Sequence, residues 1–172
     1  MLLVPLDEFY RLSHRPLPLA EPWAAASLPE PAQSLLVHTR DMTPTLAAFH
    51  AAPIALRVLR HERARGIYSR EIVLEAAGRP VLFGAIRIYL DRFPPEARAL
   101  ILADSQPLGA ILQSQKIEHT SRPEAFFAVQ PDDQICAALG LGAGAPRLFG
   151  RRNVHWSPQA EPLAEVVEIL AP

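Results

Sequence analysis

The sequence predicts an α+β fold in which short helices flank an antiparallel sheet. Strand-like segments follow one another through short turns, and short helical segments lie before and between them. Strands arranged in hairpins favour antiparallel pairing, because parallel pairs need long crossover connections. The chain has 172 residues, of which 49% are hydrophobic, enough to enclose a core. We therefore expect a single domain over residues 1–172.

A proline-rich arm is expected at the N-terminus, over residues 1–40. Its prolines are Pro5, Pro16, Pro18, Pro22, Pro29 and Pro31. Proline inside a helix removes a backbone hydrogen bond, so only short helices fit, over Asp7–Leu12 and Ala32–Val37. The apolar start lacks a basic leader and is interrupted by Asp7, so it does not resemble a signal peptide. We expect this arm to pack on the domain.

The middle of the chain predicts a helix followed by strands. The helix covers Thr45–Ala51, with Pro44 in its first turn. The strands, rich in β-branched and aromatic residues, are Ile54–His61, Ile67–Ala76 and Pro80–Leu90. In the second strand, alternation places Arg70 on the same face as Tyr68, Ile72 and Leu74. A charge among apolar side chains is costly unless it is paired, so we expect Arg70 to have a partner.

The C-terminal half alternates helices and strands. Helices are predicted over Ala97–Ala103, Ser105–Gln113 and Asp132–Leu139, and strands over Ile117–His119, Ala125–Val129, Arg147–Trp156 and Pro162–Leu170. The glycine-rich stretch from Gly140 to Ala145 matches the spacing of a dinucleotide-binding loop. That loop needs a strand before it and a helix after it, whereas here the order is reversed. We interpret the stretch as a linker that ends a helix.

Composition excludes several classes of partner. Seventeen basic and 18 acidic residues give a net charge of -1, which leaves no basic footprint for nucleic acid. Cys136 is the sole cysteine, so no internal disulfide can form and a reducing compartment is expected. No apolar stretch reaches the length of a membrane span, and the expected location is the cytoplasm. The six histidines contain no pair at short ligand spacing, so no metal site is predicted.

The last two strands carry charged residues whose orientation the pattern does not settle. Arg151 and Arg152 are neighbours, so only one of them can face a cavity. Glu165 and Glu168 also point to opposite faces of a regular strand. Judged by pattern alone, either carboxylate is more often found at the surface than at a catalytic site.

Five short motifs occur in the order seen in the chorismate lyase family, which this sequence resembles from about Leu36 to its C-terminus. They are Met42-Thr43, Arg70-Glu71-Ile72-Val73-Leu74, Pro107-Leu108-Gly109, Gly150-Arg151-Arg152, and Pro162-Leu163 with Glu168-Ile169-Leu170. The resemblance implies a six-stranded antiparallel sheet flanked by helices. This fold is related to the ligand-binding domain of a class of transcriptional regulators.

The resemblance also implies a substrate, chorismate, and a role for each site residue. Arg70 corresponds to the arginine that binds the ring carboxylate, and the backbone amides of Met42 and Leu108 correspond to two further donors. Glu168 corresponds to the glutamate that meets the hydroxyl on the opposite side. The implied reaction releases pyruvate and leaves 4-hydroxybenzoate, and no cofactor is expected because aromatisation drives it. An apolar setting is expected to raise the pKa of Glu168 toward a range useful for proton transfer, as donor or as acceptor.

One departure from the family concerns the second carboxylate of chorismate. Enterobacterial members have an arginine directly after the glycine of the third strand, but here Gly84 is followed by Ala85. Arg87 lies two residues further and on the same face as Ala85, so it is a candidate replacement. The Ile117-Glu118 pair resembles the mycobacterial-type branch, and Glu118 is a second candidate acid.

Two alternatives to this function remain open at the level of sequence. The first is a domain of the same fold that binds an aromatic acid without catalysis and acts as a sensor. The second is a related lyase that forms another hydroxybenzoate isomer. The oligomeric state is not predicted.

Overall fold

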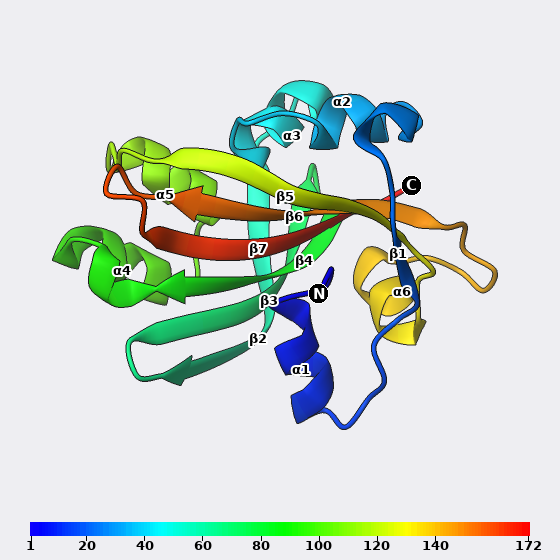
Figure 1. The fold of residues 1–172 in the computed structure, drawn as a ribbon, viewed down its shortest axis with the longest axis horizontal. Helices are drawn as coiled ribbons and strands as arrows, with labels where there is room; N and C mark the ends of the chain where they lie inside the picture. Colours follow the sequence, from blue (N-terminus) through cyan, green and yellow to red (C-terminus); the bar gives the residue numbers. More distant parts are fainter.

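A seven-stranded antiparallel sheet forms the centre of the computed structural model, which describes residues 1–172 (Figure 1). The strands lie in the order β1-β5-β6-β7-β4-β3-β2. Their bounds are β1 Ala20–Pro22, β2 Ile54–Ala64, β3 Ile67–Ala76, β4 Arg79–Tyr89, β5 Thr120–Val129, β6 Leu148–Trp156 and β7 Pro162–Leu170. The α-helices are α1 Leu6–Leu12, α2 Ala32–Leu36, α3 Met42–His50, α4 Pro95–Leu102, α5 Leu108–Ser114 and α6 Asp133–Leu139, and Ala25–Ser27 and Leu90–Arg92 are 3-10 turns. The α+β class and the antiparallel sheet are thus confirmed.

The sheet has one strand more than predicted, and this strand comes from the proline-rich arm. The short strand β1 pairs antiparallel with β5 at the edge of the sheet. Sequence patterns do not detect it because it is very short and ends in Pro22, a residue that strands tolerate only at an edge or an end. The arm also contributes α1 and α2, whose apolar side chains are buried against the sheet.

Several other predicted boundaries differ from the structure by a few residues, and the differences at β5 and α3 have identifiable reasons. The predicted strand Ile117–His119 is wrong: this segment is irregular, and the Ile117 N–H donates to the carbonyl oxygen of Leu112 at the end of α5. The predicted strand Ala125–Val129 is part of a longer strand, β5, which begins at Thr120. Its register against β6 shifts between Pro123 and Ala125, and such a bulge breaks the alternation that sequence analysis relies on. Helix α3 starts at Met42, ahead of the predicted start, because Pro44 fits within a first turn, where a missing N–H is not needed.

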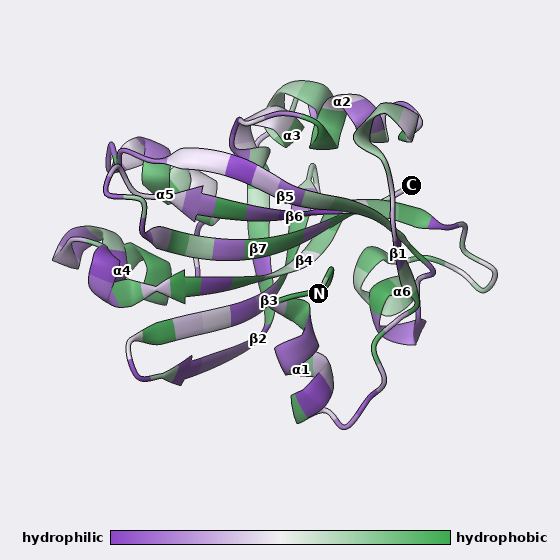
Figure 2. Cartoon of the chain, viewed as in Figure 1, coloured by the Kyte–Doolittle hydropathy of each residue, from purple (hydrophilic) through white to green (hydrophobic).

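The two faces of the sheet pack against different helices. One face, which includes Val73, Phe83 and Val167, packs against α1 and α6. The other face packs against α2 and α3 at one end and against α4 and α5 at the other. Hydrophilic bands interrupt the hydrophobic stretches of β4, β6 and β7 (Figure 2). Several of these charged residues, including Arg151 and Glu168, are buried, so the sheet encloses a polar site as well as an apolar core.

Glycines on both sides of β7 allow its neighbours to approach it near Glu168. A Cβ atom at Gly84 of β4 would collide with the carbonyl oxygen of Val167. A Cβ atom at Gly150 of β6 would lie 2.5 Å from the carbonyl oxygen of Glu168. Both positions therefore need glycine if the three strands are to keep this arrangement.

None of the helices combines the length and the apolar character that crossing a lipid bilayer requires.

Candidate functional site

A narrow cavity lies on the sheet face that carries α2 to α5, between the sheet and the first turns of α3 and α5. Its walls are Asp41, Met42, Thr43, Arg70, Ile72, Leu74, Ile86, Pro107, Leu108, Gly109, His155, Val166 and Glu168. Its volume is about 40 Å³. The structure thus brings together Arg70, Met42, Leu108 and Glu168, which are far apart in the sequence.

Arg70 enters the cavity wall from the middle of β3 and is almost completely buried, at 1% exposure. Its Nη1 donates to Asp104 Oδ1 at 3.0 Å, and its Nη2 donates to the carbonyl oxygen of Gln106 at 3.3 Å. Burial lowers the pKa of the guanidinium, and the adjacent Asp104 carboxylate opposes this effect. Its Nε is buried and has no hydrogen-bond partner. One donor of a buried cation is therefore left unused by the protein.

The partly exposed Asp104 forms an ion pair with the buried Arg70. Its Oδ2 accepts a hydrogen bond of 2.5 Å from the Tyr68 hydroxyl. Burial and this hydrogen bond raise the pKa of Tyr68, so the hydroxyl keeps its proton at neutral pH. Tyr68 and Arg70 share a face of β3, as the alternation predicts, and both anchor on the same carboxylate.

Glu168 faces the cavity from β7 and is paired with an arginine that the sequence analysis left unassigned. Arg151 Nε donates to Glu168 Oε2 at 2.5 Å. The Arg151 side chain is fully buried, and that of Glu168 is 8% exposed. The expected apolar setting is therefore wrong in one respect: a guanidinium lies directly against the carboxylate. Of the neighbours Arg151 and Arg152, the structure turns the first toward the site and the second toward Glu165.

Arg151 also ties the segment before α3 to the sheet. Its Nη1 donates to the carbonyl oxygens of Leu36 and His38, at 3.0 and 3.1 Å. Burial, together with the charge of Arg151, lowers the pKa of His38. One buried arginine thus positions both Glu168 and the chain that leads into the first turn of α3.

The first turns of α3 and α5 meet closely above the sheet. Met42 begins α3 and Leu108 begins α5. The amide groups of a first helical turn have no partner within their own helix, so they can donate to an acceptor in the cavity. Gly109 makes the approach possible, because a Cβ atom there would lie 2.8 Å from Thr43 Oγ1. The first turns of α3 and α5 therefore close the cavity on the side opposite the sheet.

Two residues considered from the sequence, Arg87 and Glu118, lie away from the cavity. Arg87 is on the opposite face of β4, where its guanidinium pairs with Glu8 and Glu165. Glu118 is exposed, in the segment before β5. Alternation along β4 correctly groups Arg87 with Ala85, but both face α1 and not the cavity. The structure does not bring Arg87 to the site at which Arg70 and Glu168 meet.

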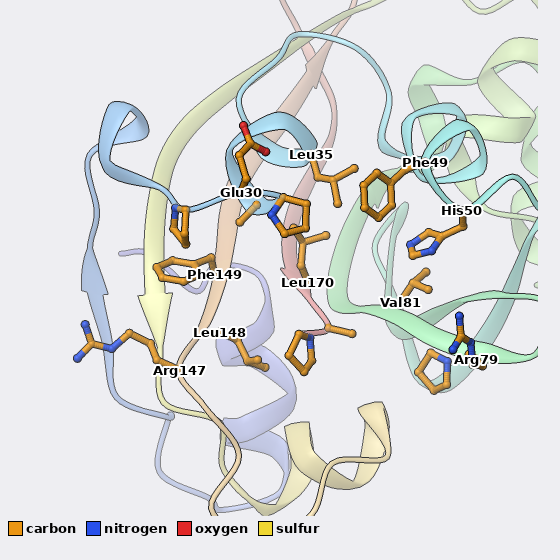
Figure 3. Close-up of a pocket in the computed structure, with 16 residues that line it drawn as sticks. Glu30, Leu35, Phe49, His50, Arg79, Val81, Arg147, Leu148, Phe149 and Leu170 are labelled. Atoms are coloured by element: carbon orange, nitrogen blue, oxygen red, sulfur yellow. The ribbon is translucent and has the colours of Figure 1, made fainter.

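A second, wider pocket lies at the far end of the sheet, between α2, α3 and the ends of β4, β6 and β7 (Figure 3). Its volume is about 440 Å³. Leu35, Phe49 and Leu170 contribute apolar surface, and Arg79 and Arg147 lie at its sides. No residue of the narrow cavity lines it. The wider pocket therefore combines apolar walls with charged residues at its edge, and neither Arg70 nor Glu168 lines it.

Comparisons with known proteins find similarity in structure and not in sequence. No family model matches this chain, and no curated protein matches it. The structure of PhnF from Mycobacterium smegmatis matches with a TM-score of 0.61 and 15% identity, over 79% of this chain and 65% of PhnF. The effector domain of the same protein matches with a TM-score of 0.58 and 15% identity, over 76% of this chain and 88% of that domain.

A third similar structure is the ligand-binding domain of a putative GntR-family transcriptional regulator from Bordetella bronchiseptica. It matches with a TM-score of 0.53 and 16% identity, over 68% of this chain and 85% of that domain. At such identities the likeness shows the fold alone. The chain has a chorismate lyase-like fold, of the kind found in the effector domains of GntR-family regulators. The sheet observed here contains seven strands.

Proposed function

We propose that the narrow cavity binds a small aromatic acid, with its carboxylate at Arg70 and its opposite end at Glu168. The observation that carries this proposal is the buried Nε of Arg70, which has no partner and belongs to a side chain lining the same cavity as Glu168. An unsatisfied buried donor costs about 1 to 3 kcal/mol, which a carboxylate ligand would relieve. Arginine suits this role because its planar fork matches a carboxylate.

The size of the cavity indicates that its walls move when a ligand enters. Ligand sites usually enclose about 300 to 1,000 Å³, whereas this cavity has about 40 Å³. The first turns of α3 and α5 form the wall opposite the sheet, and both follow irregular segments. We expect these two turns to separate on binding and to close again over the ligand.

We further propose that the ligand is chorismate and that the chain converts it to 4-hydroxybenzoate and pyruvate. In this elimination the ether C–O bond breaks, and the leaving enolpyruvate keeps the bonding electrons and becomes pyruvate once protonated. The ring loses a proton and becomes aromatic. We assign the acceptance of this proton to Glu168, because its carboxyl group lines the same cavity as Arg70 and Arg151 contacts only its Oε2. No cofactor is needed for this chemistry.

A second candidate is a domain that binds an aromatic acid without turning it over. It is favoured by the likeness to the Bordetella ligand-binding domain and to the PhnF effector domain. Both candidates use Arg70 to hold the carboxylate. They differ in what Glu168 does, since a binding domain needs it only as a hydrogen-bond acceptor.

A turnover and binding experiment separates the two candidates. The purified chain is incubated with chorismate, and pyruvate and the aromatic product are quantified by chromatography, which also identifies the hydroxybenzoate isomer. Binding of 4-hydroxybenzoate is measured in parallel by calorimetry. For a lyase we expect turnover that Glu168→Gln abolishes and Glu165→Gln retains. Glu165 is the matched control because it lies on the same strand but on the opposite face.

The remaining outcomes have distinct meanings. Saturable binding without turnover, lost in Arg70→Gln, supports the binding domain and refutes the lyase. Circular dichroism of each variant verifies that it is folded. If the folded wild type neither turns over chorismate nor binds 4-hydroxybenzoate, the proposed ligand class is refuted.

A further inference from the structure

Two histidines and an aspartate meet at one end of the cavity, although the sequence gives no hint of this. Asp41 lies directly before α3, His119 lies directly before β5, and His155 is on β6. One potential ligand atom of each residue lies within 4.8 Å of the other two. Neither histidine belongs to a short-range pair, which is why spacing rules miss the cluster.

The distances within the cluster are compatible with a shared metal ion. His119 Nε2 lies 2.9 Å from Asp41 Oδ1, and His155 Nδ1 lies 3.7 Å from the same oxygen. Ligands at about 2.1 Å from a tetrahedral ion are separated by about 3.4 Å from one another. The two distances to Asp41 Oδ1 lie on either side of this spacing, and all three atoms lie within 4.8 Å of one another, so small side-chain rotations bring them to a common ion.

An unpartnered buried atom gives independent support for a ligand. The His155 side chain is 7% exposed, and its Nδ1 has no hydrogen-bond partner. The nearest carboxylate, that of Asp41, is too far away for a hydrogen bond. His155 Nδ1 is therefore a buried atom that the protein itself leaves without a partner.

His119 is oriented in the way that metal-binding histidines usually are. Its Nδ1 lies 2.8 Å from the carbonyl oxygen of Ile117. The Ile117 carbonyl oxygen and the Asp41 carboxylate can only accept, so both ring nitrogens donate in this structure, and a metal ion at Nε2 would replace the proton shared with Asp41. Ligating histidines commonly donate their second N–H to such a backbone carbonyl. The orientation of the ring is thus determined by the protein backbone.

We propose that Asp41, His119 and His155 form a binding site for a borderline divalent transition-metal ion such as Zn²⁺. Two imidazole nitrogens and one carboxylate oxygen suit Zn²⁺ or Co²⁺ better than Mg²⁺ or Ca²⁺, which prefer oxygen ligands. Three protein ligands leave a further coordination position for water or for a ligand group.

The surroundings permit an ion to reach this site. Asp41 and His119 line a polar surface pocket of about 440 Å³, and Asp41 and His155 line the inner cavity. The cluster therefore lies between solvent and the cavity. The positive charge of Arg151 opposes a nearby cation, but the ion pair with Glu168 offsets that charge. The metal site does not depend on the identity of the organic ligand.

Cobalt binding to the full chain tests this inference. The protein is stripped with a chelator and titrated with Co²⁺ alone, and the visible d–d absorption is recorded. We expect one Co²⁺ per chain, with Zn²⁺ displacing it and Mg²⁺ having no effect. In His119→Gln the Kd is expected to rise on the order of 100-fold, because a direct ligand costs at least as much as the 10- to 100-fold seen for outer-shell groups.

His61→Gln is the matched control, because His61 also faces a carboxylate but has no second histidine beside it. Its Nδ1 lies 3.5 Å from Asp104, and its side chain is 60% exposed. This variant should bind Co²⁺ like the wild type. His155→Gln is tested with circular dichroism alongside, since His155 is buried. Absence of Co²⁺ bands in the folded wild type, or bands that persist in His119→Gln, would overturn the proposal, as would their loss in His61→Gln.

Discussion

Replacing Arg151 with methionine should destabilise the chain severely, because it leaves the carboxylate of Glu168 buried without its partner. The Arg151 side chain is 0% exposed and that of Glu168 is 8% exposed. Removing one member of a buried ion pair costs about 3 to 5 kcal/mol of unfolding free energy. Arg151 also donates to the carbonyl oxygens of Leu36 and His38. The loss of unfolding free energy should therefore lie toward the upper end of this range.

The size of this effect can be measured by unfolding and by a double-mutant cycle. For a chain of this length each kcal/mol lowers Tm by about 2 to 4 °C, so Arg151→Met should lower Tm by roughly 6 to 20 °C. Urea unfolding is compared for wild type, Arg151→Met, Glu168→Gln and the double variant. The double variant removes both charges, so its cost should fall short of the sum of the single costs by at least about 2 kcal/mol.

Arg152→Met is the control for this experiment. Arg152 is the next residue in β6, its side chain is 25% exposed, and it lies 3.6 Å from Glu165 on the opposite face. Pairs of this kind contribute about 1 kcal/mol or less. If Arg151→Met costs no more than Arg152→Met, or if the single costs simply add, Arg151 and Glu168 do not form the buried pair described here.

Three further substitutions probe how the site is built. Gly109→Val should force the first turns of α3 and α5 apart and weaken binding of 4-hydroxybenzoate at least tenfold; calorimetry showing unchanged affinity would contradict the close packing. Gly84→Ala should cost more than about 1 kcal/mol, because its Cβ would collide with the Val167 carbonyl oxygen, and an unchanged urea midpoint would refute that contact. Asp104→Asn should cost about 1 to 3 kcal/mol, because it weakens the charged hydrogen bond that Arg70 donates, and a neutral result would show that Arg70 is held by other groups.

Local sequence patterns predict most of the fold, because strands and turns are each marked by characteristic residue types in neighbouring positions. The strands Ile67–Ala76 and Pro162–Leu170 begin and end as predicted, since each is a run of strand-forming residues bounded by turn residues. The strand β1 has no such run of strand-forming residues. It forms because its backbone pairs with β5, a contact between residues far apart in the sequence.

Part of the candidate site can also be predicted from the sequence. Alternation in β3 places Arg70 among apolar residues, and the resemblance adds Met42, Leu108 and Glu168. The structure brings these residues into one cavity. Their proposed roles in catalysis stay predictions.

The antiparallel α+β architecture can be predicted from the sequence alone, because hydrophobic period and turn chemistry are local properties of the chain. Which charges meet depends on tertiary packing. Alternation assigns Arg151 and Arg152 to opposite faces but does not say which face is covered, because that depends on helices packed from elsewhere in the chain. In the same way Asp41, His119 and His155 converge only when α3, β5 and β6 pack together. Contacts between distant residues arise from packing, which spacing along the sequence does not encode.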